Sequence, residues 1–194
     1  MSRPDLDLAI NMAVLEPHLP MLAGCVRRGF ATYQTQYPHA VRAAHDNAAA
    51  AKNVHRHVLE ELEIAVAEMA GLTMVSARGL EVLNLHDRAV ARFKKMDGMG
   101  HSKSYPTMQA RNFDQQMSLP NLPPAATRLT FGYEPDLAFS TILRVLVACP
   151  LGQSTHWCAQ VNEGPAGEAS WVDITPQRLA GTEPFKHYGS GTDG

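Results

Sequence analysis

The residues that could do chemistry are concentrated between residues 88 and 128. This stretch, called the basic block below, holds seven of the 17 lysines and arginines but only two of the 19 acidic residues, a net charge of +5 in a chain of net charge −2. The flanking segments carry −3 over residues 1–87 and −4 over residues 129–194. Clustered cations attract phosphate groups. We therefore expect a binding site in the basic block.

The predicted function is non-catalytic binding of nucleic acid or of a phosphate backbone. Cationic side chains would contact phosphates, while aromatic and amide side chains would stack on bases or form hydrogen bonds to them. The expected binding residues are Arg88, Arg92, Lys95, Lys103, Tyr105, Gln109, Arg111 and Asn112. Because the whole chain is slightly acidic, a solvated basic face is the alternative explanation of this block.

Two other functions stay open. The segregated charges would also suit a protein partner or a homodimer, as in an inhibitor or antitoxin-like module. A metal-dependent hydrolase or nuclease would draw its site from Glu81, His86, Asp87, His101 and Lys103. No motif defines catalytic residues, so the sequence leaves open whether the chain is an enzyme, and it predicts neither a cofactor nor a metal site.

Cysteine and histidine come close together in one place. Cys149, His156 and Cys158 could converge as zinc ligands if the turn at residues 151–154 paired Cys149 with His156. A one-residue change of register would separate them. Small cysteines buried beside Trp157 are therefore the favoured interpretation.

Hydrophobic periodicity indicates which elements position these residues. A spacing of three to four predicts a helix over residues 5–36, broken at Pro17 and Pro20. A second, longer helix is expected to be capped by Asn47 and to end at Gly71.

From Leu72 the period changes to two, which is typical of strands. Three short strands are expected at residues 72–77, 80–86 and 89–95, followed by three more at residues 127–134, 141–149 and 155–161. A two-residue turn at Asp87–Arg88 would place Leu85 opposite Val90 and Glu81 opposite Lys94. Val82 and Phe93 would then share the core face.

These elements predict an α+β fold. An N-terminal helical layer would pack on one antiparallel sheet of about five or six strands, with a short helix over residues 106–117 between the third and fourth strands. Residues 1–162 would form one domain, helical over 1–71 and sheet over 72–162. Residues 163–194 would form a peripheral tail rich in glycine and proline, in which only residues 170–175 could dock as an edge strand. The expected core residues are Phe30, Leu62, Val66, Val82, Phe93, Phe131, Val145, Val147 and Trp157.

Composition also predicts the compartment. No stretch approaches the roughly 20 apolar residues of a membrane span, and the N-terminus is acidic where a signal peptide is basic. The three cysteines are widely spaced and odd in number, which argues against a disulfide framework. We expect a cytosolic protein without a membrane partner.

A short pattern resembles one found in uncharacterised bacterial proteins. It consists of Arg92-Phe-Lys-Lys95, Pro106-Thr107, Leu119-Pro-Asn-Leu-Pro123 and Leu129-Thr-Phe-Gly-Tyr133, with Trp157 downstream. The resemblance implies no particular activity. It implies a role on mobile elements or in conflict with phage.

Overall fold

The helices lie in the first part of the chain. The computed structural model describes residues 4–77, 79–102, 107–165 and 167–176. Its helical elements before the sheet are α1 (Leu8–Leu15), η1 (Glu16–His18), α2 (Leu19–Gln36), α3 (His39–Ala44) and α4 (Asn47–Val66).

Prolines and a capping aspartate set the ends of these helices. The predicted break is confirmed, because Pro17 and Pro20 stand in the first turns of η1 and α2, where a missing N–H is tolerated. The predicted cap of α4 is wrong by one residue: the carboxylate of Asp46 accepts a hydrogen bond of 2.7 Å from the Ala49 amide. The helix ends at Val66, and Gly71 follows in the left-handed conformation with φ of 80°.

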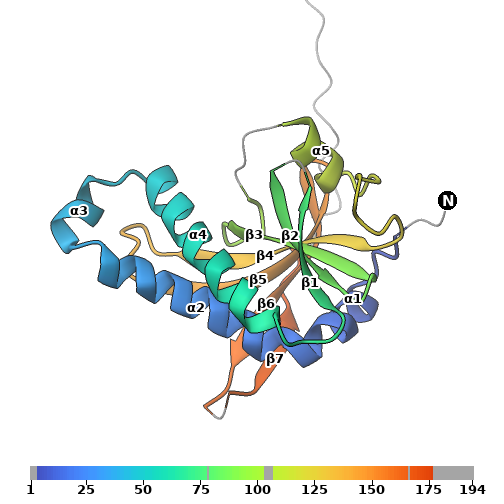
Figure 1. The fold of residues 1–194 in the computed structure, drawn as a ribbon, viewed down its shortest axis with the longest axis horizontal. Coiled ribbons are helices and arrows are strands. Elements are labelled where there is room, and N and C mark those ends of the chain that lie inside the picture. Colours follow the sequence, from blue (N-terminus) through green and yellow to red (C-terminus); the bar gives the residue numbers. More distant parts are fainter. Residues whose placement is uncertain (1–3, 78, 103–106, 166, 177–194) are drawn as a thin grey trace, which may run out of the picture.

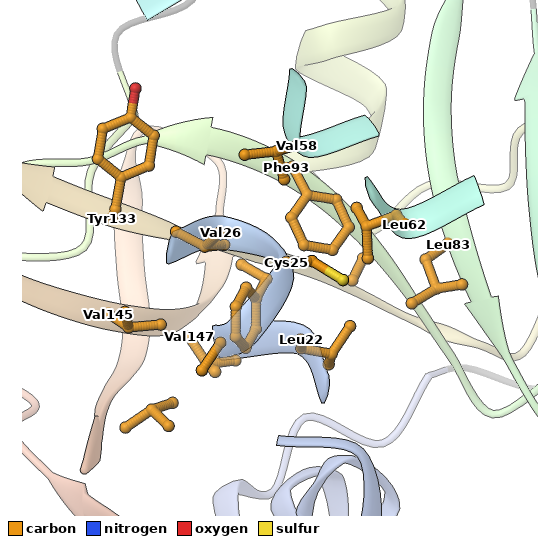
Figure 2. Close-up of a cluster of buried hydrophobic side chains, with 14 of the residues drawn as sticks. Leu22, Cys25, Val26, Val58, Leu62, Leu83, Phe93, Tyr133, Val145 and Val147 are labelled. Atoms are coloured by element: carbon orange, nitrogen blue, oxygen red, sulfur yellow. The ribbon is translucent and has the colours of Figure 1, made fainter. Parts of the chain in front are cut away.

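The helices α2 and α4 lie side by side on one face of the sheet (Figure 1). Gly29 permits their close approach, since a Cβ at this position would lie 2.6 Å from the backbone nitrogen of Val58. Figure 2 shows the resulting core, in which Leu22 and Val26 of α2 and Leu62 of α4 lie among side chains of the strands. All nine predicted core residues are buried.

The N-terminal helices also have the composition of a membrane span. By length and composition alone, Leu8–Gln36 could cross a membrane, a test that core helices of soluble proteins pass as well. Leu15, Leu19 and Leu22 are fully buried in the core of the protein. The cytosolic location stays a prediction.

The sheet is larger than predicted and of a different kind. Within the described residues it has seven strands in sequence order, which are β1 (Leu72–Ala77), β2 (Leu80–Leu85), β3 (Ala89–Lys95), β4 (Thr127–Pro135), β5 (Ile142–Leu151), β6 (Ser154–Glu163) and β7 (Ala169–Asp173). The expected all-antiparallel pairing is wrong at one place, because β3 and β4 are parallel. The seventh strand lies in the segment predicted to be a peripheral tail, where residues 170–175 were expected to be able to dock as an edge strand, and β7 does form the edge beside β6.

The connection between β3 and β4 explains the parallel pair. Residues 96–126 carry the chain back to the end at which β3 began, and a crossover of a dozen or more residues is what a parallel pair needs. It contains the predicted short helix, α5 (Met108–Asp114), which the Thr107 hydroxyl caps by accepting a hydrogen bond from the Ala110 amide. Phe113, Leu119 and Leu122 of this crossover pack on Val82 and Val90, so the sheet is covered on both faces.

The predicted register of the β2–β3 hairpin is wrong by one residue. The turn has three residues, and His86 and Asp87 both have positive φ angles, 54° and 58°. Leu83 therefore pairs with Ala91, and Leu85 with Ala89. Leu83, Leu85 and Phe93 face the helices, whereas Val82 faces the crossover. Continued along the strands, this register would place Glu81 opposite Phe93, so the expected Glu81–Lys94 pair across the hairpin does not occur.

Candidate functional site

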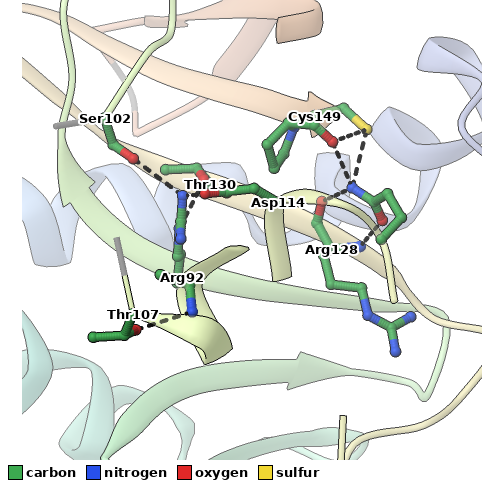
Figure 3. Close-up of polar contacts among 10 residues, drawn as sticks. Arg92, Ser102, Thr107, Asp114, Arg128, Thr130 and Cys149 are labelled. Carbon is green, nitrogen blue, oxygen red and sulfur yellow. Dashed lines mark hydrogen bonds and ion pairs between the residues drawn. The ribbon is translucent and has the colours of Figure 1, made fainter. Parts of the chain in front are cut away.

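Arg92 of the basic block forms an internal ion pair with Asp114. Its guanidinium donates to Asp114 of α5 at 2.6 Å, to Ser102 at 3.1 Å and to Thr130 at 3.1 Å (Figure 3). It also lies 4.8 Å from the centre of the Phe113 ring. Only 3% of the residue is exposed. Arg92 thus fixes α5 to the sheet, and its burial removes it from the surface.

Arg128 is buried as well, at the start of β4. Its guanidinium donates to the backbone carbonyls of Pro123, Pro124 and Ala126, which close the end of the crossover. Its own backbone is held by Gln116, whose side-chain oxygen accepts from the Arg128 amide and whose NH₂ group donates to the Arg128 carbonyl, both at 2.8 Å. The same NH₂ group donates to the Pro150 carbonyl at 2.8 Å. Gln116 therefore bridges β4 and β5 beyond their last paired residues.

Among the described residues, the expected binding residues Arg88 and Lys95 lie at opposite ends of β3. Arg88 is exposed before the start of β3, and Lys95 ends that strand, so the two lie roughly 20 Å apart at the usual strand rise. Arg111 is exposed on α5, where Gln109 and Asn112 are half-buried. Lys103 and Tyr105 lie outside the described residues. Of the four methionines in the basic block, Met99, Met108 and Met117 are exposed, and Met96 is buried.

A cleft opens where the parallel strands β3 and β4 end. Its volume is about 610 Å³. One wall comes from α4, in which Ala48, Ala51, Lys52 and His55 recur at helical spacing and so share a face. The opposite walls are the strand ends and the two loops that follow them, residues 96–101 and 136–139. The carboxyl ends of neighbouring parallel strands are a common position for ligand sites in α/β sheets.

The cationic groups of the cleft come from β3 and α4. Lys94, Lys95 and Lys52 line it, and the Lys95 ammonium lies 4.9 Å from the centre of the Phe139 ring. Burial lowers the pKa of the Lys94 ammonium, and the charge of Arg92 acts in the same direction. Phe139, Leu137 and the alanines of α4 provide an apolar surface.

The three carboxylates that line the cleft have internal partners. Glu134 accepts from Arg144 at 2.6 Å. Asp97 accepts from the amides of Met99 and His101 in its own loop. Asp136 accepts from the amides of Ser140 and Thr141. Of the three carboxylates, only Glu134 is paired with an arginine, and the amide hydrogen bonds of Asp97 and Asp136 bring no positive charge.

A small cavity adjoins the cleft and shares His55, Lys94 and Lys95 with it. The cavity has a volume of about 10 Å³ and is otherwise lined by Gly132, Tyr133 and apolar side chains. The Nδ1 atom of His55 and the hydroxyl of Tyr133 are buried without a hydrogen-bond partner among the described residues. Burial lowers the pKa of His55 to about 4, with a further contribution from Lys94. Burial also raises the pKa of Tyr133, so both groups are neutral at pH 7.

The metal site that the zinc and nuclease alternatives would need is not assembled among the described residues. No group of three or more histidine, cysteine, aspartate or glutamate side chains is placed there to hold a metal ion. Cys149 pairs with Trp157 and faces the helical core, whereas Cys158 faces the other side of the sheet. His86 forms a hydrogen bond with His18, whose Nε2 atom lies 3.1 Å from that of His86.

Lowering the pH should destabilise the fold through His55 and His18. Burial lowers the pKa of both histidines in the folded protein, and His86 adds to the effect at His18. Below the ordinary histidine pKa of 6.5 the unfolded chain therefore binds more protons than the folded one. Stability should fall as pH drops from about 6.5 towards 4, by up to about 1.4 kcal/mol per pH unit for His55.

Urea unfolding between pH 7 and pH 4.5 measures this slope. A His55→Leu variant should show a shallower slope than the wild-type protein, whereas His156→Asn, which changes an exposed histidine, should keep it. An unchanged slope in His55→Leu would show that this histidine is not kept neutral by the fold.

The fold and the cleft define a class: an α+β protein with a mixed sheet and a ligand-sized cleft at the ends of its parallel strand pair. Comparisons with protein-family models, with curated proteins and with solved structures each find no match. The resemblance to uncharacterised bacterial proteins stays an expectation.

Proposed function

We propose that this protein binds a nucleotide, free or as part of a nucleic-acid strand, in the cleft at the ends of β3 and β4. The proposal keeps the phosphate-binding function predicted from the basic block but transfers it to Lys95, Lys94 and Lys52. The observation that carries it is the lining of the cleft: Lys52, Lys94 and Lys95 lie beside an apolar wall, and one of the three carboxylates there is paired with Arg144.

The size and the surface of the cleft suit a nucleotide. A volume of about 610 Å³ lies within the usual range for small-molecule sites, roughly 300–1,000 Å³. The apolar wall formed by Phe139, Leu137 and Ala51 would contact the base. The lysines would contact the phosphate, since a charged ammonium is a good donor to phosphate oxygens.

Isothermal titration calorimetry with the four ribonucleoside monophosphates and with inorganic phosphate tests the proposal. We expect a nucleotide to bind more tightly than phosphate alone. Lys95→Met, which keeps an apolar stem and removes the charge, should weaken binding about tenfold, because a hydrogen bond to a charged group contributes about 1.5–3 kcal/mol.

Arg88→Met is the matched control. Arg88 belongs to the same basic block but lies at the opposite end of β3, so its loss should leave the affinity unchanged. Equal weakening by both variants would mean that the cleft is not the site. A short single-stranded oligonucleotide separates the two sources of the nucleotide: its affinity exceeds that of the monophosphate only if neighbouring nucleotides also make contacts.

A further inference from the structure

A second cleft opens beside the one at the strand ends. Its volume is about 450 Å³, and it lies between α3, the start of α4 and the turn that joins β4 to β5. This turn reaches to the end of the helical layer at which α3 lies (Figure 1). There the Gln34 side chain of α2 donates to the Ser140 carbonyl at 2.6 Å. Because Asn47, Leu137 and Phe139 line both clefts, the two clefts adjoin.

Arg42 makes the second cleft cationic. Its guanidinium, which is always charged in proteins, lines this cleft together with His39 and His45. None of the described residues that line the cleft is acidic. Asp46 is adjacent in sequence, but its carboxylate caps α4 by accepting from a backbone amide at 2.7 Å, and it does not line the cleft. Arg42 Nε donates to the Tyr37 carbonyl at 3.0 Å, which leaves the two terminal nitrogens to face an anion.

Phe139 stands where the two clefts meet. It is only 6% exposed, and its φ of 52° is a left-handed conformation that bulky residues rarely adopt. Asp136 holds the turn around it by accepting from two backbone amides. Strained residues of this kind persist where the surrounding structure fixes them, and they are frequent at ligand sites. Lys95 of the first cleft lies 4.9 Å from the centre of the ring, and Arg42 lines the cleft beyond it.

This division of the cations between two clefts suits a strand of nucleotides. A strand presents its phosphates one nucleotide apart, and the bases between them can stack on aromatic side chains. A single nucleotide in the first cleft would leave the second cleft unused. Two nucleotides joined through a pyrophosphate have adjacent phosphates, so they would need their cations in one cluster.

Resting on the proposed function, we propose that the two clefts bind consecutive nucleotides of a single-stranded nucleic acid, one phosphate lying against the lysines of the first cleft and the next against Arg42. The ring of Phe139 lies between the two nucleotides. Because linked nucleotides bind as one molecule, the contacts of the second cleft add to those of the first, and the affinity rises steeply with the second nucleotide.

Isothermal titration calorimetry compares the tightest-binding ribonucleoside 5′-monophosphate with its 5′-phosphorylated dinucleotide. The dinucleotide should bind the wild-type protein at least tenfold more tightly. Arg42→Met should remove most of this gain and leave the affinity for the mononucleotide unchanged, whereas Lys95→Met should weaken the binding of both. Ala43→Trp tests the second cleft independently, because Ala43 is exposed and lines it, so an indole there would occupy the space of the second nucleotide.

Ala44→Trp is the matched control, because Ala44 is exposed next to Ala43 but lines neither cleft. It should keep the tenfold gain. A gain with either the ribose or the deoxyribose dinucleotide supports the proposal, and the tighter of the two identifies the kind of strand.

Three results would overturn the two-nucleotide site while nucleotide binding in the first cleft stands. They are equal affinities for the mononucleotide and the dinucleotide, a gain that survives in both Arg42→Met and Ala43→Trp, and tighter binding of a pyrophosphate-linked dinucleotide. If the wild-type protein binds neither mononucleotides nor dinucleotides, both proposals fail.

Discussion

Replacing Asp114 with alanine should lower the free energy of unfolding by about 3–5 kcal/mol, because it leaves the buried guanidinium of Arg92 without its counter-charge. The two side chains are 2.6 Å apart, and they are only 3% and 24% exposed. Burial raises the pKa of the Asp114 carboxyl, and Arg92 opposes that shift. Urea unfolding, monitored by circular dichroism, measures the loss.

Two further variants identify the cause of this loss. Adding Arg92→Met to Asp114→Ala should recover part of the stability, since an apolar side chain has no charge to leave unpaired. Glu60→Ala removes a half-exposed carboxylate that pairs with Arg56 and His57 on its own helix, and it should leave stability nearly unchanged. If Asp114→Ala proved as mild as Glu60→Ala, the buried pair would not stabilise the fold.

Gly132→Ala should lower the free energy of unfolding by a similar amount, about 3 kcal/mol or more, for a steric reason. A Cβ at Gly132 would lie only 1.7 Å from the backbone oxygen of Lys94, in the neighbouring strand. The obstacle is backbone and cannot rotate away, so β3 and β4 would have to separate. An alanine without such a clash would instead stabilise the protein slightly by restricting the unfolded chain, so the sign of the change is informative.

Gly164→Ala is the matched control for this substitution. Gly164 lies in the turn between β6 and β7, where the nearest atoms to an added Cβ are 3.5 Å away, an ordinary contact distance. The free energy of unfolding of Gly164→Ala should differ from that of the wild-type protein by no more than about 0.5 kcal/mol. Chemical denaturation compares the two variants, and similar stabilities would refute the close approach of β3 and β4 at Gly132.

Much of the fold could be predicted from local patterns in the sequence. The 3.6-residue period of apolar residues predicts the helices, and Pro17 and Pro20 predict the break between them. The expected core positions are buried because the apolar residues of a periodic pattern share the face that packs on the core. The pairing of β3 with β4 could not be predicted in this way, since a strand has the same period in parallel and antiparallel sheets. The hairpin register was missed because His86, in the left-handed conformation, adds a third residue to the turn.

The candidate site was less predictable than the fold. A count of charges assumes that the charged side chains are exposed. Arg92 instead pairs with Asp114, 22 positions further along the chain, and Arg128 donates to backbone carbonyls. Lys95 was among the expected binding residues and does line the cleft. His55 and Tyr133 were not, because both lie outside the basic block. Their shared cavity exists only once α4 has packed on the ends of β3 and β4.

The parallel pair β3–β4 also has a consequence for the order of folding. It joins two meanders, β1–β3 and β4–β7, in which each strand pairs with its neighbour in sequence. Such hairpins form within about 1–10 μs, whereas joining the meanders requires the closure of residues 96–126. Non-local pairing of this kind slows folding. Because the cleft lies across this junction, it exists only where the two meanders have joined, and any molecule that occupies it favours the folded state over the unfolded chain.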